Sequence, residues 1–204
     1  MKDLFVLVAD KNMDFLMRGL LPRIPVIENV MAFTFDILVH PYRDSGIFNE
    51  SDDFLRPFST NYTYALVILD HHGSGREQIE RGEVENAISH KLNISGWKDR
   101  NVVICIDPEL ENWIWVNETR IKEAISWERE PGLYEWLHLN KWKTPSEPKP
   151  KHPKEAFEAA IRLSNTPRSS SLYRSIASQA NYRNCQDAAF QKMLLQLREW
   201  FTAK

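Results

Sequence analysis

The stretch Ala65-Leu66-Val67-Ile68-Leu69-Asp70-His71-His72-Gly73-Ser74-Gly75 indicates both a fold and a place for a site. Its first five residues are all apolar, which is typical of a strand buried on both faces of a parallel sheet. The apolar run ends at Asp70, and the glycines that follow predict a turn. Ligands and metal ions bind at the carboxyl ends of strands in open α/β sheets. Asp70 is therefore expected at the functional edge of the sheet.

Other apolar runs predict strands at 4–8, 33–39 and 102–106, with helices at 11–21 and 77–92. Between the second and third strands we expect a loop at 40–46 and a short helix at 51–56, N-capped by Ser51. Strands alternating with helices imply right-handed crossovers. The predicted fold class is α/β: a Rossmann-like, mainly parallel sheet of about four strands flanked by helices. The helix at 77–92 is expected to turn four side chains inward: Ile79, Val84, Ile88 and Leu92.

The rest of the chain is predicted to be helical. We expect Asp107 to N-cap a helix with Pro108 at its first position, then helices at 119–127, 133–139, 154–163, 169–178 and 187–201. A proline-containing loop at 141–153 separates two of them. We therefore expect a single domain, residues 1–204, in which an α/β core at 1–140 packs against a helical part at 141–204.

Charge is distributed unevenly along the chain. The net charge is −2, but residues 1–140 hold 14 Lys and Arg against 23 Asp and Glu, and residues 141–204 hold 12 against 5. This pattern fits a metal site beside a polyanion-binding surface, or two parts that neutralise each other by packing. The candidate nucleic-acid-binding residues are Lys149, Lys151, Arg168 and Arg174. The alternative for each is a solvated charge on a loop.

Acidic residues follow three of the predicted strands: Asp10 the first, Asp70 the third, and Asp107, Glu109 and Glu111 the fourth. If the strands are parallel, these carboxylates gather at one edge, as suits Mg²⁺ or Mn²⁺. The histidines His40, His71 and His72 are candidate bases or further ligands. A helix cap is the alternative explanation for Asp10 and Asp107. The turn at residues 73–76 offers backbone N–H groups to a phosphate, although it lacks the P-loop spacing.

The cysteines and the hydropathy indicate a setting. Cys105 and Cys185 lie far apart and lack zinc-ligand spacing, which favours free thiols in a reducing, cytoplasmic environment. No apolar run approaches the ~20 residues of a membrane span, so we expect no membrane partner. The first residues predict a strand, and we expect no signal peptide.

Three segments resemble a Toprim-like family whose relatives are the OLD-type and RloB-like proteins of bacterial anti-phage defence. They are residues 6–11 (VLVADK), 69–75 (LDHHGSG) and 107–113 (DPELENW), and residues 153–156, 168–173 and 185–190 add to the likeness. It is greatest to a small component of the methylation-associated defence system. The resemblance implies a Toprim-like sheet, Mg²⁺ or Mn²⁺ bound by Asp10, Asp70 and Glu111, and other defence proteins as partners. It also implies phosphodiester chemistry with Asp70, His72 and Glu111 as catalytic residues.

The chain departs from the family pattern at two positions. Family members generally carry a Glu directly after the first strand and an Asp-x-Asp motif after a later one, whereas this chain has Ala9 and His72 at those positions. Two main hypotheses follow: a metal-dependent nuclease of a defence system, or a catalytically degenerate subunit that binds nucleic acid or protein. A phosphohydrolase acting on small nucleotides is a third.

Overall fold

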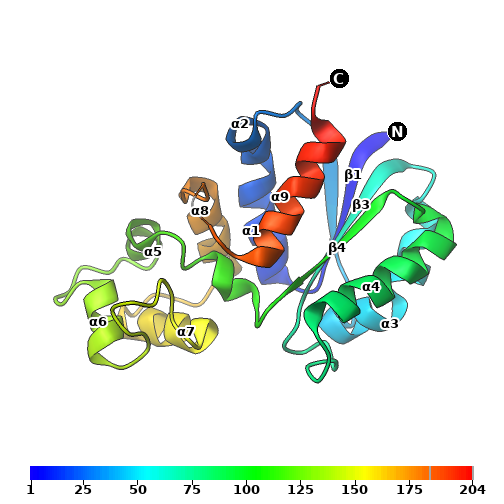
Figure 1. Cartoon of the computed structure of the whole chain (residues 1–204). Coiled ribbons are helices and arrows are strands. Elements are labelled where there is room, and N and C mark those ends of the chain that lie inside the picture. The colour runs from blue at the N-terminus through cyan, green and yellow to red at the C-terminus, as the bar shows by residue number, and fades with distance from the viewer. Residues whose placement is uncertain (184, 204) are drawn as a thin grey trace.

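A parallel β-sheet forms the centre of the molecule (Figure 1). The computed structural model describes residues 1–183 and 185–203. Within them the sheet comprises β1 (Lys2–Val8), β2 (Phe35–Val39), β3 (Tyr62–Asp70) and β4 (Asn101–Ile106), in the order β2-β1-β3-β4. All pairings are parallel. The predicted α/β, Rossmann-like fold class is confirmed.

Helices cover both faces of the sheet. One face carries α1 (Lys11–Leu20) and α9 (Ala188–Phe201), and the other carries α3 (Arg43–Leu55) and α4 (Arg81–Leu92) (Figure 1). A short helix, α2 (Ile24–Glu28), follows α1. This double cover explains why β3 is apolar from residue 65 to residue 69, where every side chain is fully buried.

The helical C-terminal part packs on this core. It contains α7 (Pro153–Leu163) and α8 (Ser170–Gln179), and is preceded by a 3₁₀ turn η4 (Leu110–Trp113), α5 (Glu118–Ala124) and α6 (Leu133–Leu139). Helices α1 and α8 approach closely at Gly19, where a Cβ atom would lie 2.7 Å from the carbonyl oxygen of Arg174. The Arg23 guanidinium, just after α1, donates to the carbonyls of Ala177 and Ala180 near the end of α8.

Three ion pairs join the basic C-terminal part to the acidic core. They are Lys154–Glu109, Lys192–Glu85 and Arg198–Glu28. These contacts support the interpretation that the two parts neutralise each other by packing. Both cysteines are buried and unpaired. Among the described residues, no helix has the length and apolar character needed to span a membrane.

Three sequence-based predictions about local structure were wrong. The segment at 40–46 is not all loop, because α3 begins at Arg43 and Ser51 lies buried in its interior. Ile79 is 37% exposed, because α4 begins only at Arg81. Asp107 does not N-cap a helix: the chain bends at residues 107–108, Glu109 is extended, and η4 begins at Leu110. The Asp107 side chain instead lies 3.5 Å from the His71 ring.

Candidate functional site

The carboxyl edge of the sheet gathers acidic side chains. Val8 pairs with Ile68 in the β1–β3 register, so Asp10 is level with Asp70 on the neighbouring strand. Asp44 comes from the first turn of α3, and Glu109 and Glu111 come from the segment after β4. The charges of Asp10 and Glu111, the other two predicted metal ligands, act on Asp70 at this edge. We call the five residues Asp10, Asp44, Asp70, Glu109 and Glu111 the carboxylate edge.

Asp70 is at the centre of the carboxylate edge. Its Oδ1 is buried and accepts no hydrogen bond from any described residue. Burial raises the pKa of Asp70 well above its ordinary value, and neighbouring carboxylates raise it further. In decreasing order of effect these neighbours are Asp44, Glu111, Asp10 and Glu109. The fold therefore holds a carboxyl group where its charged form has neither water nor a donor at one oxygen.

Asp44 adjoins Asp70 directly. The backbone N–H of Asp70 donates to Asp44 Oδ1 at 2.8 Å. Burial raises the pKa of Asp44, and this hydrogen bond opposes the rise. The sequence prediction missed Asp44 because residues 40–46 were assigned to a loop. Its signal was present, since an acid soon after β2 lies at the same edge as the acids that follow β1 and β3.

Glu109 and Glu111 already have partners within the protein. The Tyr173 hydroxyl donates to Glu111 Oε1 at 2.5 Å. Lys154 binds Glu109 twice, through its backbone N–H at 3.3 Å and through Nζ at 3.5 Å. Burial raises the pKa of Glu111, and the Tyr173 hydrogen bond opposes that rise. Lys154 interacts electrostatically with three of these carboxylates. Burial alone would lower the pKa of Lys154, but Glu111, Glu109 and Asp70 raise it above its ordinary value.

Asp10 acts as a helix cap. Its Oδ1 accepts the backbone N–H of Met13 at 2.9 Å, which satisfies one of the donors at the start of α1. The capping alternative for Asp10 is therefore realised, while its charge still adds to the field at Asp70.

The fit to a divalent cation is limited to part of the carboxylate edge. Across residues 1–183 and 185–203, no three His, Cys, Asp or Glu side chains are arranged to hold one metal ion. Mg²⁺ commonly takes only one or two carboxylates, with waters and phosphate oxygens as its other ligands. Asp70, with its unpartnered Oδ1, and the adjoining Asp44 meet this smaller requirement.

The histidines lie in other environments. His72 is exposed in a hollow of about 330 Å³ that His71, Glu77 and Asp107 also line. The His71 ring approaches the Ile79 carbonyl at 3.0 Å and Asp107 at 3.5 Å. His40 is buried against Phe54, and burial lowers its pKa, so its ring is neutral at pH 7. His72 as a catalytic residue stays a prediction.

The glycine turn after β3 already carries an anion of the protein. Glu77 Oε1 accepts the backbone N–H groups of Gly73 at 2.8 Å and of Gly75 at 3.3 Å. Hydrogen bonds from backbone N–H groups, its own first and then that of Gly73, lower the pKa of this fully exposed carboxyl group. A phosphate at this turn would have to displace Glu77.

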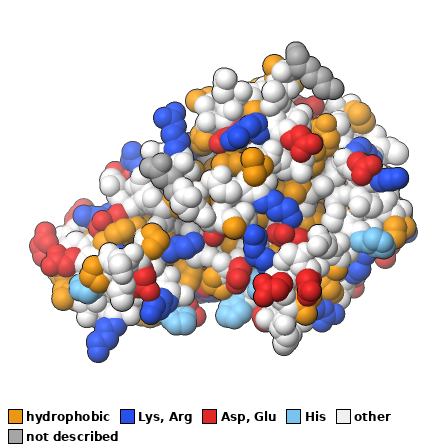
Figure 2. Space-filling model, in the orientation of Figure 1, with side chains coloured by type: hydrophobic (Ala, Val, Ile, Leu, Met, Phe, Trp, Pro, Cys, Tyr) orange, Lys and Arg blue, Asp and Glu red, His pale blue; other side chains and the backbone are white. Residues whose placement is uncertain are grey.

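Three of the four predicted nucleic-acid-binding residues are in ion pairs. Lys149 pairs with Asp187 at 3.3 Å, Lys151 with Glu147 at 3.5 Å, and Arg168 with Glu158 at 2.8 Å. The fourth, Arg174, is exposed on α8. On the face in Figure 2, basic and acidic side chains are interspersed. Burial raises the pKa of the Tyr173 hydroxyl, which donates to Glu111 of the carboxylate edge, and the charge of Arg168 opposes that rise.

Comparison with known proteins adds no assignment. No family model, curated protein or solved structure matches this chain.

Proposed function

We propose that the carboxylate edge binds Mg²⁺ or Mn²⁺ through Asp70 and Asp44 and supports hydrolysis of phosphodiester bonds. The observation that carries this proposal is Asp70 Oδ1, a buried carboxylate oxygen with no partner among the described residues and with other carboxylates around it. A divalent cation would supply the positive charge that this arrangement lacks. The resemblance to Toprim-like defence proteins implies the same chemistry.

Neighbouring residues have separate roles in this proposal. Lys154 neutralises Glu109 and faces the Glu111 and Asp70 charges, so it is placed to orient a phosphate group at the edge of the site. Tyr173 keeps its proton, because burial and the Glu111 charge raise the pKa of its hydroxyl, and its hydrogen bond holds Glu111 in place. A bound cation would polarise a phosphoryl oxygen and lower the pKa of an attacking water.

The test is nicking of supercoiled plasmid DNA, and cleavage of a single-stranded RNA, with Mg²⁺ or Mn²⁺. The wild type is expected to cleave one of them, and Asp70→Asn is expected to lose that activity. Asp53→Asn is a matched control, because it makes the same chemical change at an exposed residue of α3. Full activity of Asp70→Asn would overturn the assignment of the site.

The second candidate is a binding subunit without catalysis. It is favoured by a specific observation: Asp10, Glu109 and Glu111 already accept hydrogen bonds inside the protein. In this case no divalent metal supports cleavage, yet the protein binds nucleic acid in a salt-sensitive manner or forms a stable complex with another defence protein. A gel-shift series at increasing salt, and purification with coexpressed defence proteins, separate it from the nuclease.

A further inference from the structure

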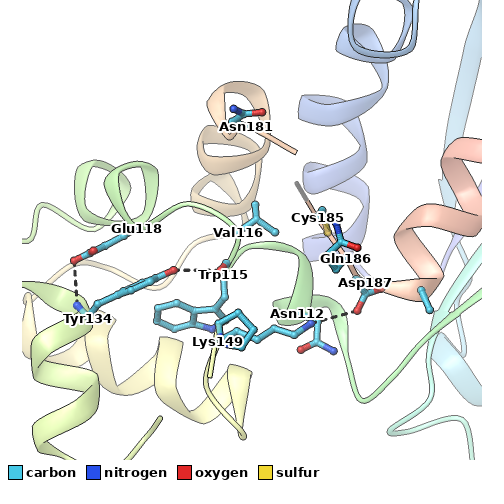
Figure 3. Close-up of a pocket in the computed structure, with 12 residues that line it drawn as sticks. Asn112, Trp115, Val116, Glu118, Tyr134, Lys149, Asn181, Cys185, Gln186 and Asp187 are labelled. Carbon is cyan, nitrogen blue, oxygen red and sulfur yellow. Dashed lines mark hydrogen bonds and ion pairs between the residues drawn. The ribbon is translucent and has the colours of Figure 1, made fainter. Parts of the chain in front are cut away.

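A second pocket adjoins η4 at Asn112. It has a volume of about 580 Å³, within the range of small-molecule sites. Two successive residues of η4 belong to different sites. Glu111, in the carboxylate edge, accepts the Tyr173 hydroxyl, and Asn112 lines the pocket. The other walls come from α5, α6, the loop before α7 and the segment that leads into α9 (Figure 3). This pocket takes no part in the proposed metal chemistry.

Two aromatic side chains contribute to the apolar part of the pocket, and their polar groups are already hydrogen-bonded. Trp115 and Tyr134 line it together with Val116 and Pro148. The Trp115 indole donates to the Pro153 carbonyl at 2.9 Å, and the Tyr134 hydroxyl donates to the Trp115 carbonyl at 3.2 Å. Because these polar ends are occupied, the aromatic residues offer the pocket mainly apolar surface. Such walls favour a planar, partly apolar ligand.

Three carboxamide side chains supply the polar contacts: Asn112, Asn181 and Gln186. Asn112 is buried, whereas Asn181 and Gln186 are exposed. The Asn112 amide group donates to the Asp107 carbonyl, and Asn181 Oδ1 accepts the Arg183 backbone N–H. Because an amide NH₂ has two donors and its oxygen two lone pairs, each carboxamide retains a donor and an acceptor, the combination that pairs with the edge of a nucleobase.

The charged residues that line the pocket disfavour an anionic ligand. Lys149 is paired with Asp187 at 3.3 Å (Figure 3). Asp187 also accepts the Trp113 indole N–H and backbone N–H groups of α9. Glu118 adds a further negative charge, and its Oε1 accepts the Tyr134 backbone N–H at 3.0 Å. The net charge of the lining residues is therefore negative, which disfavours a phosphate group.

From the aromatic and apolar lining, the carboxamides and the excess negative charge, we infer that this pocket binds the base of a neutral nucleoside. A nucleoside monophosphate is expected to bind more weakly than its parent nucleoside, because its phosphate would meet Glu118 and Asp187 without an unpaired cation among the lining residues. This site goes beyond the proposed phosphodiester chemistry and does not depend on it.

The experiment is calorimetric titration of the full chain with adenosine, guanosine, cytidine and uridine, and with the matching monophosphates. At least one nucleoside is expected to bind saturably, and at least about 10-fold more tightly than its monophosphate. Ala188→Trp should abolish this binding, because residue 188 is exposed at the pocket and an indole there would occupy it. Leu195→Trp, at an exposed position of α9 that does not line the pocket, is the matched control and should bind normally.

A double variant, Asn181→Ala with Gln186→Ala, keeps the inference testable if Ala188→Trp fails to fold, since both positions are exposed. It should weaken nucleoside binding by about 10-fold. No saturable binding of any nucleoside, or equal binding by Ala188→Trp and the wild type, would overturn the inference. Asp70→Asn should bind nucleoside normally, so failure of the metal site and failure of this pocket are distinguishable.

Discussion

Two carboxylates, the buried Glu85 and Asp70 with its buried Oδ1, have opposite surroundings. Glu85, on α4, accepts the backbone N–H of Cys105 at 2.9 Å and an ammonium hydrogen of Lys192 at 2.8 Å, and it lies 3.4 Å from Arg81. Lys192 also donates to the Val103 carbonyl. Glu85 and Lys192 therefore provide hydrogen-bond partners for the backbone of Cys105 and Val103 on the outer edge of β4. Asp70 ends the neighbouring strand, with one oxygen unpartnered and like charges around it.

The difference separates a structural carboxylate from a candidate functional one. A buried charge is tolerated when donors and cations surround it, and a sheet edge is stable when its backbone groups are bonded. Glu85 meets both conditions. Asp70 fails the first, because its side chain has like charges around it and one unpartnered oxygen. A group that costs stability in the protein alone is a natural place for a ligand.

The largest effect is expected from Glu85→Ala. This change leaves the Cys105 N–H without its acceptor and removes the partner of Lys192 and Arg81. We expect a loss of about 2–4 kcal/mol in the free energy of unfolding. Urea denaturation measures it, with Glu83→Ala, an exposed neighbour on α4, as the control. Equal losses in the two variants would erase the contrast with Asp70.

Asp70→Asn is expected to change the free energy of unfolding in the opposite direction, toward greater stability. It removes a carboxyl group whose pKa is raised by burial and by neighbouring carboxylates. The free energy of unfolding of the metal-free protein should therefore increase by about 1–2 kcal/mol at pH 8. The pKa of Asp70 is higher in the folded protein than in the unfolded chain. The wild type therefore loses stability as the pH rises above the pKa of Asp70 in the unfolded chain.

The advantage of Asp70→Asn should therefore grow as pH rises and shrink at acid pH. Thermal unfolding across a pH series measures this trend, with Asp53→Asn as the control at an exposed site. A variant that is less stable than the wild type at pH 8 would show that Asp70 is a compensated structural carboxylate like Glu85.

A smaller effect is expected from Tyr173→Phe. The change removes the donor to Glu111, at a cost of about 1 kcal/mol. That hydrogen bond lowers the Glu111 pKa against the effect of burial, so its removal raises the pKa further. The loss of stability should be larger at pH 8 than at pH 5, because only the charged carboxylate needs the donor. A pH-independent loss would indicate that Tyr173 contributes packing alone.

Much of the fold could be predicted from the sequence because β1, β3 and β4 each contain five consecutive buried residues. Continuous apolar runs marked these strands, and the alternation with helices led to the parallel sheet. The start of α3 was missed because residues 40–46 contain Pro, Ser and Gly, which favour turns. In the structure α3 begins at Arg43, and Gly46 lies in contact with His40 and Tyr42, where a side chain would collide with both.

The candidate site was predicted in place but not in detail. Strand ends indicated Asp10 and Asp70, because that inference needs only the direction of the strands. Asp44 was missed because residues 40–46 were assigned to a loop, although an acid soon after β2 indicates the same edge. Its hydrogen bond from the Asp70 backbone N–H is a tertiary contact that the sequence does not reveal. Likewise, the pairing of Glu111 with Tyr173 joins residues 62 positions apart.

The most direct test of the central proposal, that Asp70 belongs to a divalent cation site, is calorimetric titration of the metal-free full chain with Mn²⁺. We predict saturable binding of about one ion per chain by the wild type and by Asp53→Asn, and loss of that binding in Asp70→Asn. Absence of saturable binding by the wild type, or equally tight binding by Asp70→Asn, would contradict the proposal.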